Sequence, residues 1–286
     1  MRSKAERCNS GTRFDTHPAP GLPLEEVGQY GSPPRGEIDG VKAMILAAGR
    51  GERMRPLTDT TPKPLLKVGG KPLIVWQIER LVKAGFCDLV INHAWLGSQV
   101  EDVLEDGSAW GARIAWSREG IALETAGGVV TALPLLEANG RDQPFVVVSA
   151  DIYTDYDYTR LVDVADALRL DYPKRAAHLV LTDNPSWHSC GDMALVNGRV
   201  AREGASLPTS LHTSLHTYAN IGVFHPRVFD GLTRQVPLAL FPWAYALANE
   251  GRVTGEIFHG VWDNVGTPAQ LCALDRRLQH EGAAHG

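Results

Sequence analysis

The chain has 286 residues, of which 44% are hydrophobic and 21% charged, and its formal net charge is −5. These values are ordinary for a globular protein, and a chain of this length can bury a sizeable core. The slight acidity argues against a nucleic-acid-binding protein, which usually carries a dense basic face. The four cysteines are far apart and form no C-x-x-C pair. This spacing argues against a disulfide framework or a zinc ribbon and favours a reducing, cytoplasmic location.

Neither a membrane span nor a secretory signal is expected. No apolar run approaches the roughly 18 residues that a spanning helix needs, and no apolar segment follows the first charges at the N-terminus. Residues 1–40 are rich in glycine, proline and charge without apolar periodicity, so we expect a disordered N-terminal extension there. A functional tail and a translation start near Val41 are the alternatives. Residues 41–286 are expected to form a single domain.

From Val41 the sequence alternates apolar runs with amphipathic segments. The run VKAMILAAG (41–49) ends in glycine and is typical of a buried parallel strand. The segment 72–85 places Ile74 and Ile78 at helical spacing, with a proline at its start and a glycine at its end. The same criteria predict strands at 87–92, 112–117 and 144–151, and helices at 96–106 and 125–136.

The second half of the sequence is more mixed. Asn197-Gly198 lies within the segment 194–201 and fits a type I′ hairpin turn. Because strands and helices alternate along most of the chain, we expect an α/β fold. Its sheet should be Rossmann-like and mostly parallel, with helices on both faces. Further strands are predicted at 176–182, 217–225 and 252–259, and further helices at 241–251 and 267–279.

The stretch LAAGRGERMRPLTDTTPKPL (46–65) follows the first predicted strand. Ligands of open parallel sheets bind where the strands end, and the glycines at 49 and 51 would let backbone N–H groups approach a phosphate. A dinucleotide fingerprint would need a glycine at Met54. A Walker loop would need Ser or Thr where Pro72 stands. The sequence therefore excludes both of these familiar phosphate loops.

Positive charge and proline are concentrated in the same stretch. Arg50, Arg53, Arg55 and Lys63 carry the charge, and three prolines restrict the backbone and lower the entropy lost when it is ordered. A stiff cationic loop after a strand suits several phosphates in a row, as in a nucleoside triphosphate. A solvated basic turn is the alternative that spacing alone leaves open.

The stretch 46–65 also resembles the signature of the sugar-1-phosphate nucleotidyltransferases, roughly L-A-A-G-x-G-T/S/E-R-L/M-x-P-L-T-x-x-x-P-K-P-L. The resemblance covers residues 42 to about 280 and implies a GT-A-like nucleotide-diphospho-sugar transferase fold. It also implies that a sugar 1-phosphate attacks the α-phosphorus of an NTP and releases pyrophosphate. The further matching segments are LETAGGV (123–129), VVVSAD (146–151), YANIGVFHP (218–226) and WDNVGTPAQL (262–271).

The implied reaction needs no general base, because a phosphate oxygen is already a nucleophile. Catalysis then rests on alignment and charge neutralisation. By the resemblance, Arg53 would hold the departing phosphates, and Lys63 would bridge the α-phosphate and the sugar phosphate. Asp151 completes the catalytic set. The nucleotide-binding positions that the resemblance implies are Ala47, Ala48, Gly49, Thr125 and Gly128.

A magnesium site is expected at the end of the apolar strand PFVVVSAD, where Asp151 stands at a position typical of a Mg²⁺ ligand. Relatives carry a second acid directly before V/I-G, and here that position is Asn264. Asp263 is the alternative, although neighbours on an extended segment face opposite ways. His212 and His216 could hold a metal on a helix, but their Ser- and Thr-rich surroundings favour a polar loop.

The sugar side is expected to include Asn92, Asp192, Asn220 and Gly222, although each could equally be a satisfied polar position near a strand end. NHAWL (92–96) and the compact C-terminus resemble the family members that join UTP to N-acetylmuramic acid 1-phosphate in cell-wall recycling.

Several alternatives to this substrate pair stay open. They are mannose-1-phosphate guanylyl transfer, glucose-1-phosphate thymidylyl or uridylyl transfer, and a non-catalytic regulatory subunit. A regulatory subunit should have lost Arg53, Lys63 or Asp151, and all three are present. The expected partners are the NTP and the sugar 1-phosphate, with no nucleic acid or membrane, in a monomer or small homo-oligomer.

Overall fold

The structure is a computed structural model that describes residues 40–202 and 214–284. The expected extension at 1–40 lies outside these ranges, except for Gly40, and so does His212 of the possible histidine pair. All of the described residues belong to one compact unit. Within them, no helix is both long and apolar enough to cross a membrane.

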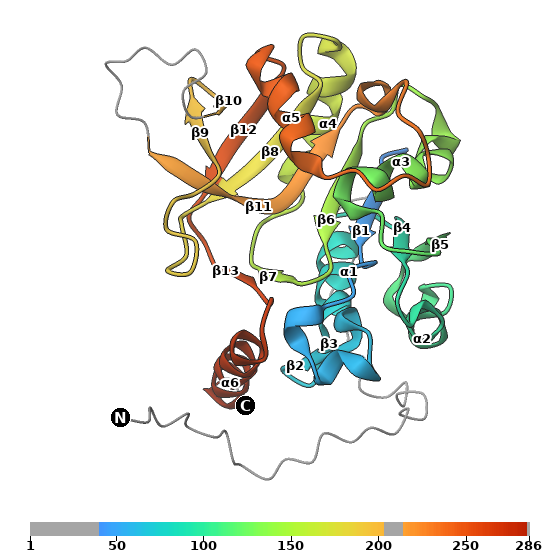
Figure 1. The fold of residues 1–286 in the computed structure, drawn as a ribbon, viewed down its shortest axis with the longest axis vertical. Coiled ribbons are helices and arrows are strands. Elements are labelled where there is room, and N and C mark those ends of the chain that lie inside the picture. The colour runs from blue at the N-terminus through green and yellow to red at the C-terminus, as the bar shows by residue number, and fades with distance from the viewer. Residues whose placement is uncertain (1–39, 203–213, 285–286) are drawn as a thin grey trace. The chain divides into compact units, whose positions relative to one another are not determined.

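A nine-stranded sheet, ordered β5-β4-β1-β6-β11-β8-β12-β10-β9, forms the centre of the described chain (Figure 1). Its strands all run in the same direction except β10 and β11. The predicted α/β fold with a mostly parallel sheet is therefore confirmed. The strands are β1 Ala43–Leu46, β4 Asp88–His93, β5 Arg113–Arg118, β6 Phe145–Ser149, β8 Ala177–Thr182, β9 Met193–Val196, β10 Arg199–Ala201, β11 Leu215–Phe224 and β12 Val253–Phe258.

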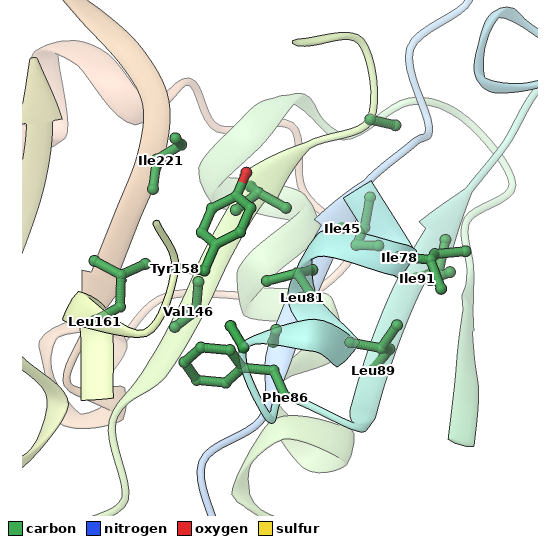
Figure 2. Close-up of a cluster of buried hydrophobic side chains, with 14 of the residues drawn as sticks. Ile45, Ile78, Leu81, Phe86, Leu89, Ile91, Val146, Tyr158, Leu161 and Ile221 are labelled. Carbon is green, nitrogen blue, oxygen red and sulfur yellow. The ribbon is translucent and has the colours of Figure 1, made fainter. Parts of the chain in front are cut away.

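Helices cover both faces of this sheet because the side chains of each strand alternate between them. Ile45 packs in one layer with α1, α2 and α4, whereas Met44 packs in the other with α3 and α5. Figure 2 shows the first layer, where Ile78 and Leu81 of α1 lie beside Ile45. The helices are α1 Leu73–Lys83, α2 Gly97–Leu104, α3 Glu124–Leu136, α4 Arg160–Asp171, α5 Leu240–Asn249 and α6 Pro268–Ala284.

Two outcomes concern local sequence signals. The predicted type I′ turn between β9 and β10 is confirmed, with φ of 50° at Asn197 and 74° at Gly198. Helix α4 is absent from the predicted elements, although its buried residues Leu161, Ala165 and Leu168 recur at helical spacing. Asp163 and Asp166 lie between them and weaken the apolar pattern of the sequence.

A separate apolar cluster joins α6 to the loop after β1, to β2 and to the segment after β13. Leu271 and Leu274 of α6 pack with Met54, Val68 and Val265. This cluster therefore holds the loop after β1 and the segment before α6 against the same helix. Two short antiparallel strand pairs lie here: β7 Ile152–Thr154 with β13 Trp262–Asn264, and β2 Lys67–Val68 with β3 Lys71–Pro72.

Candidate active site

The loop after β1 starts at an edge where neighbouring strands also end. Leu46 is in register with Asn92 of β4 and with Ser149 of β6, and these strands are parallel to β1. The Asn92 side-chain Oδ1 accepts the N–H of Ala47 at 2.8 Å, and the N–H of Ala150 donates to the carbonyl of Leu46 at 3.0 Å. Ala47 and Asp151 are therefore brought together, as the sheet topology predicts.

The glycine-started loop folds back on itself through short 3₁₀ turns, η2 Glu52–Met54, η3 Leu57–Asp59 and η4 Lys63–Leu65. Gly51 has a φ of 68°, and a Cβ there would stand 3.0 Å from Thr58 Cγ2 and 3.2 Å from Lys63 Cβ. The Thr58 hydroxyl donates to the carbonyl of Gly51 at 2.8 Å. Only glycine suits this crowded, left-handed position, and it lets Lys63 lie beside the start of the loop. Gly49 is exposed, with open space where a side chain would stand.

The four cationic side chains of the loop differ in their contacts. Arg55 binds Asp59 at 3.0 Å, and the Arg50 guanidinium lies 4.1 Å from the centroid of the Trp95 ring. Lys63 instead forms an ion pair with Asp151, and only 12% of its side chain is exposed. Arg53 makes no hydrogen bond or ion pair within the described residues. A Cβ on Gly266 would stand 3.2 Å from its Nη2, so Arg53 lies beside the segment that follows β13.

The predicted metal ligands are brought together by the pairing of β7 with β13. Asn264 is in register with Ile152, the neighbour of Asp151, and the N–H of Val265 donates to the Asp151 carbonyl at 2.8 Å. The Oδ1 of Asn264 is buried and has no hydrogen-bond partner in the described part of the chain. An orphaned buried acceptor is costly, and a bound cation would satisfy it.

Asp263 points to the other side of β13. Its Oδ2 accepts a hydrogen bond from Arg277 Nη2 at 2.5 Å, as expected for alternate residues of a strand. Among residues 40–202 and 214–284, no group of three or more His, Cys, Asp and Glu could hold a metal. A cation on Asp151 and Asn264 would thus take its remaining oxygens from substrate phosphates and water, which is the usual mode of Mg²⁺. The residues present fit such an ion.

The buried side chain of Asn92 is hydrogen-bonded to the start of the loop. Only 2% of it is exposed, and besides accepting from Ala47 it donates from Nδ2 to Glu119 Oε1 at 2.8 Å. A Cβ on Gly128 would stand 2.8 Å from this Nδ2, so the glycine lets α3 approach. Asn92 thus positions the start of the loop, and Gly128 permits the close approach of α3 to Asn92. The expected sugar contact of Asn92 and the expected nucleotide contact of Gly128 stay predictions.

Glu119 belongs to the same network but is absent from the predicted site. Its Oε2 accepts the N–H of Leu123 at 3.1 Å. Burial raises the pKa of the Glu119 carboxyl, against the hydrogen bonds from Asn92 and Leu123. Because Glu119 follows Arg118 at the end of a predicted strand, the local sequence is typical of an exposed charged pair and does not indicate burial. Thr125, in the first turn of α3, stays half-buried and keeps its place as a nucleotide-side candidate.

The remaining sugar candidates are placed differently from one another. The Asp192 carboxylate is engaged by His188 Nε2 at 2.9 Å and by the N–H of Tyr218 at 2.8 Å. Gly222 pairs inside the sheet, and a Cβ there would meet Phe224 at 2.9 Å, so only glycine fits the packing there, and its sugar-side role stays a prediction. Asn220 has a φ of 57° at the irregularity in β11, and its side chain makes no hydrogen bond with any described residue.

Comparisons with known proteins agree with this arrangement. Residues 42–281 match the family described as nucleotidyl transferase. The chain is 47% identical over 233 residues to N-acetylmuramate alpha-1-phosphate uridylyltransferase of Neisseria meningitidis serogroup B, covering 81% of this chain and 95% of that protein. It is 35% identical over 244 residues to the protein of the same name from Caulobacter vibrioides, covering 82% of this chain and 96% of that protein.

A solved structure supports the fold alone. It is described as a glucose-1-phosphate thymidylyltransferase from Bacillus anthracis and has a TM-score of 0.69 to this chain at 20% identity. The match covers 84% of this chain and 95% of that one.

Proposed function

The chain belongs to the nucleotidyl transferase family, and from this premise we propose that it joins UTP to N-acetylmuramic acid 1-phosphate. It is a sugar-1-phosphate nucleotidyltransferase, an enzyme of the class that its relatives represent. The proposed products are UDP-N-acetylmuramic acid and pyrophosphate, in a cytoplasmic step of cell-wall sugar recycling. The likeness to two uridylyltransferases over nearly their whole length supports the choice of substrates.

The catalytic part of the proposal is supported by the ion pair of Lys63 with Asp151 and by two neighbouring groups with unused polar atoms. Asn264 precedes Val265, which is hydrogen-bonded to Asp151, and Arg53 lies beside Gly266. In the reaction, an oxygen of the sugar phosphate forms a bond to the α-phosphorus of UTP. The bond from that phosphorus to the bridging oxygen breaks, and pyrophosphate leaves with the electron pair.

Charge neutralisation is the task of the side chains in this scheme. Lys63 would neutralise the α-phosphate and orient the incoming phosphate, and Arg53 would hold the β- and γ-phosphates. Asp151 and Asn264 would hold Mg²⁺, which supplies further positive charge to the phosphates when bound. Asn92 fixes the start of the loop through Ala47, so that the backbone beside Gly49 is positioned before the nucleotide arrives.

A substrate panel tests the proposal. The purified full chain would be incubated with Mg²⁺ and each pairing of UTP, GTP or dTTP with N-acetylmuramic acid 1-phosphate, mannose 1-phosphate or glucose 1-phosphate, and pyrophosphate release would be measured. We expect the highest kcat/KM with UTP and N-acetylmuramic acid 1-phosphate. A higher kcat/KM for GTP with mannose 1-phosphate, or for either nucleotide with glucose 1-phosphate, would reject the proposed substrates.

A further inference from the structure

An indole side chain outside the predicted site lies half in solvent beside β13. Trp187, in the loop between β8 and β9, is 53% exposed and is the only aromatic residue among the exposed large hydrophobics of the described chain. Its ring stacks on Trp262 of β13, with centroids 6.3 Å apart and an interplanar angle of 27°. The His188 ring also stacks on Trp187, with centroids 6.0 Å apart, and the part of the indole that both neighbours leave exposed is open to a ligand.

The stack stands next to the metal-ligand position. Trp262 precedes Asn264 by two residues in β13, so the two side chains leave the same face of the strand about 7 Å apart. That distance is comparable with the width of one pyranose ring. The Trp262 Nε1 donates to the carbonyl of Ala219 at 2.9 Å, at the irregularity of β11 that carries Asn220. The stack thus lies beside the segment of β11 that carries Asn220.

The exposure of Trp187 does not come from a loosely held loop. Asn184 Nδ2 donates to the carbonyl of Leu215 at 2.9 Å, and its Oδ1 accepts from the Thr217 hydroxyl at 2.9 Å. At the other end, Asp192 accepts from the N–H of Tyr218. Gly191, at a φ of 67°, leaves no room for a Cβ, which would stand 2.8 Å from the carbonyl carbon of Leu215. The loop is tied to β11 at both ends, so the indole is presented in a defined place.

We infer that Trp187, together with Trp262, forms an aromatic platform for the pyranose ring of the acceptor sugar phosphate, which makes Trp187 a specificity-determining residue. The inference rests on the proposed function of this site. A flat aromatic face accepts the C–H face of a sugar ring, while the hydroxyl groups at the ring edge remain free for polar contacts. With the sugar on this platform, its 1-phosphate would extend along β13 toward Asn264, Asp151 and Lys63.

The test compares Trp187→Ala and Trp187→Phe with the parent and with Leu170→Ala, which shortens another exposed apolar side chain, on α4. We expect Trp187→Ala to raise the KM for the sugar 1-phosphate about three- to tenfold, the amount that a stacked aromatic contact contributes. The KM for the NTP should change less than twofold, Trp187→Phe should retain most of the sugar affinity, and Leu170→Ala should match the parent. Melting temperatures of all variants would be recorded.

Calorimetric titration of the same variants with the sugar 1-phosphate and Mg²⁺ provides a readout that does not need turnover. An unchanged KM and Kd for the sugar phosphate in Trp187→Ala would overturn the inference. So would an equal rise in both KM values accompanied by a lower melting temperature, which would indicate a merely structural stack. The substrate proposal fails separately: if the parent prefers another sugar 1-phosphate, the platform is tested with that sugar.

Discussion

Two charged regions of the molecule show opposite degrees of internal matching. Between α4 and β12, the Glu256 carboxylate accepts a hydrogen bond from the Tyr156 hydroxyl on one oxygen and from the Arg160 guanidinium on the other. Both of its oxygens are therefore bonded within the chain. At the carboxyl edge of β1 and β6, Arg53 has no partner within the described residues, and Asn264 Oδ1 is buried without one. The charged groups of the first region are paired with one another. In the second region Lys63 and Asp151 are paired, but Arg53 and the Asn264 Oδ1 have no partner among the described residues.

The difference teaches where to look for function in this chain. Buried or half-buried polar groups that fully satisfy each other stabilise a structure, whereas unsatisfied groups gathered at a strand edge indicate a missing partner. Substitutions in the two regions should therefore separate activity from stability.

The largest effect is expected for Lys63→Ala. Removal of this cation leaves the phosphates of the reacting pair without neutralisation, so pyrophosphate release should fall about 10³-fold in kcat/KM. Arg55→Ala is the matched control, because Arg55 stands on the same loop but is paired with Asp59; its activity should stay within about twofold of the parent. Activity that survives Lys63→Ala in a folded variant would contradict the assignment of this site.

A smaller effect is expected for Asn264→Asp, which adds a charged oxygen to the metal-ligand position. The Mg²⁺ concentration that gives half-maximal activity should fall about tenfold, and calorimetric titration with Mg²⁺ and a non-hydrolysable NTP analogue should show tighter binding. The control is Asp263→Asn, since Asp263 faces Arg277 on the other side of β13. The assignment is wrong if Asp263→Asn shifts the metal dependence and Asn264→Asp leaves it unchanged.

The smallest effect on activity is expected for Glu256→Gln, which should lower the free energy of unfolding by about 1–2 kcal/mol with kcat/KM unchanged. Burial alone would raise the pKa of Glu256, but His178, Tyr156 and Arg160 outweigh it and hold that pKa below its ordinary value of 4.5. The stabilisation is thus complete above pH 4.5 and is lost as the pH falls through the lower, folded-state pKa.

Thermal melts of the parent and Glu256→Gln between pH 3 and 7 would check this dependence, and the difference in melting temperature should shrink on the acidic side. A constant difference across this range would show that the Glu256 charge is not what stabilises the region.

Much of the fold was predictable because its signals are local. The apolar run ending at Leu46, the glycines and prolines of the following loop, and the Asn197-Gly198 turn each specify a backbone conformation over a few residues. The strand that ends before Asp151 and the cationic loop could likewise be placed at one edge of the sheet, because parallel strands share that edge. Their meeting through the ion pair of Lys63 with Asp151 follows from this topology.

The remaining features depend on contacts between distant segments, which periodicity does not contain. The family pattern indicates Asn264 in place of Asp263, but its position opposite Ile152, the neighbour of Asp151, depends on the register of β13 on β7. The roles of Asn92 and Gly128 depend on the approach of α3 to β4, and the burial of Gly222 depends on its place between β6 and β8. Trp187 could not be singled out from the sequence, since nothing near it in the chain shows that it stacks on Trp262.

The apolar cluster under α6 has a consequence for the order of assembly during synthesis. The N–H of Gly69 donates to Asp275 of α6 at 2.8 Å across 206 positions of sequence, and Met54 packs against Leu271 and Leu274. A growing chain that has completed the sheet still lacks the surface on which the loop at 46–65 rests. We therefore expect the loop at 46–65 to take its final form only after residues 268–284 have been synthesised, because α6 supplies the surface against which it packs.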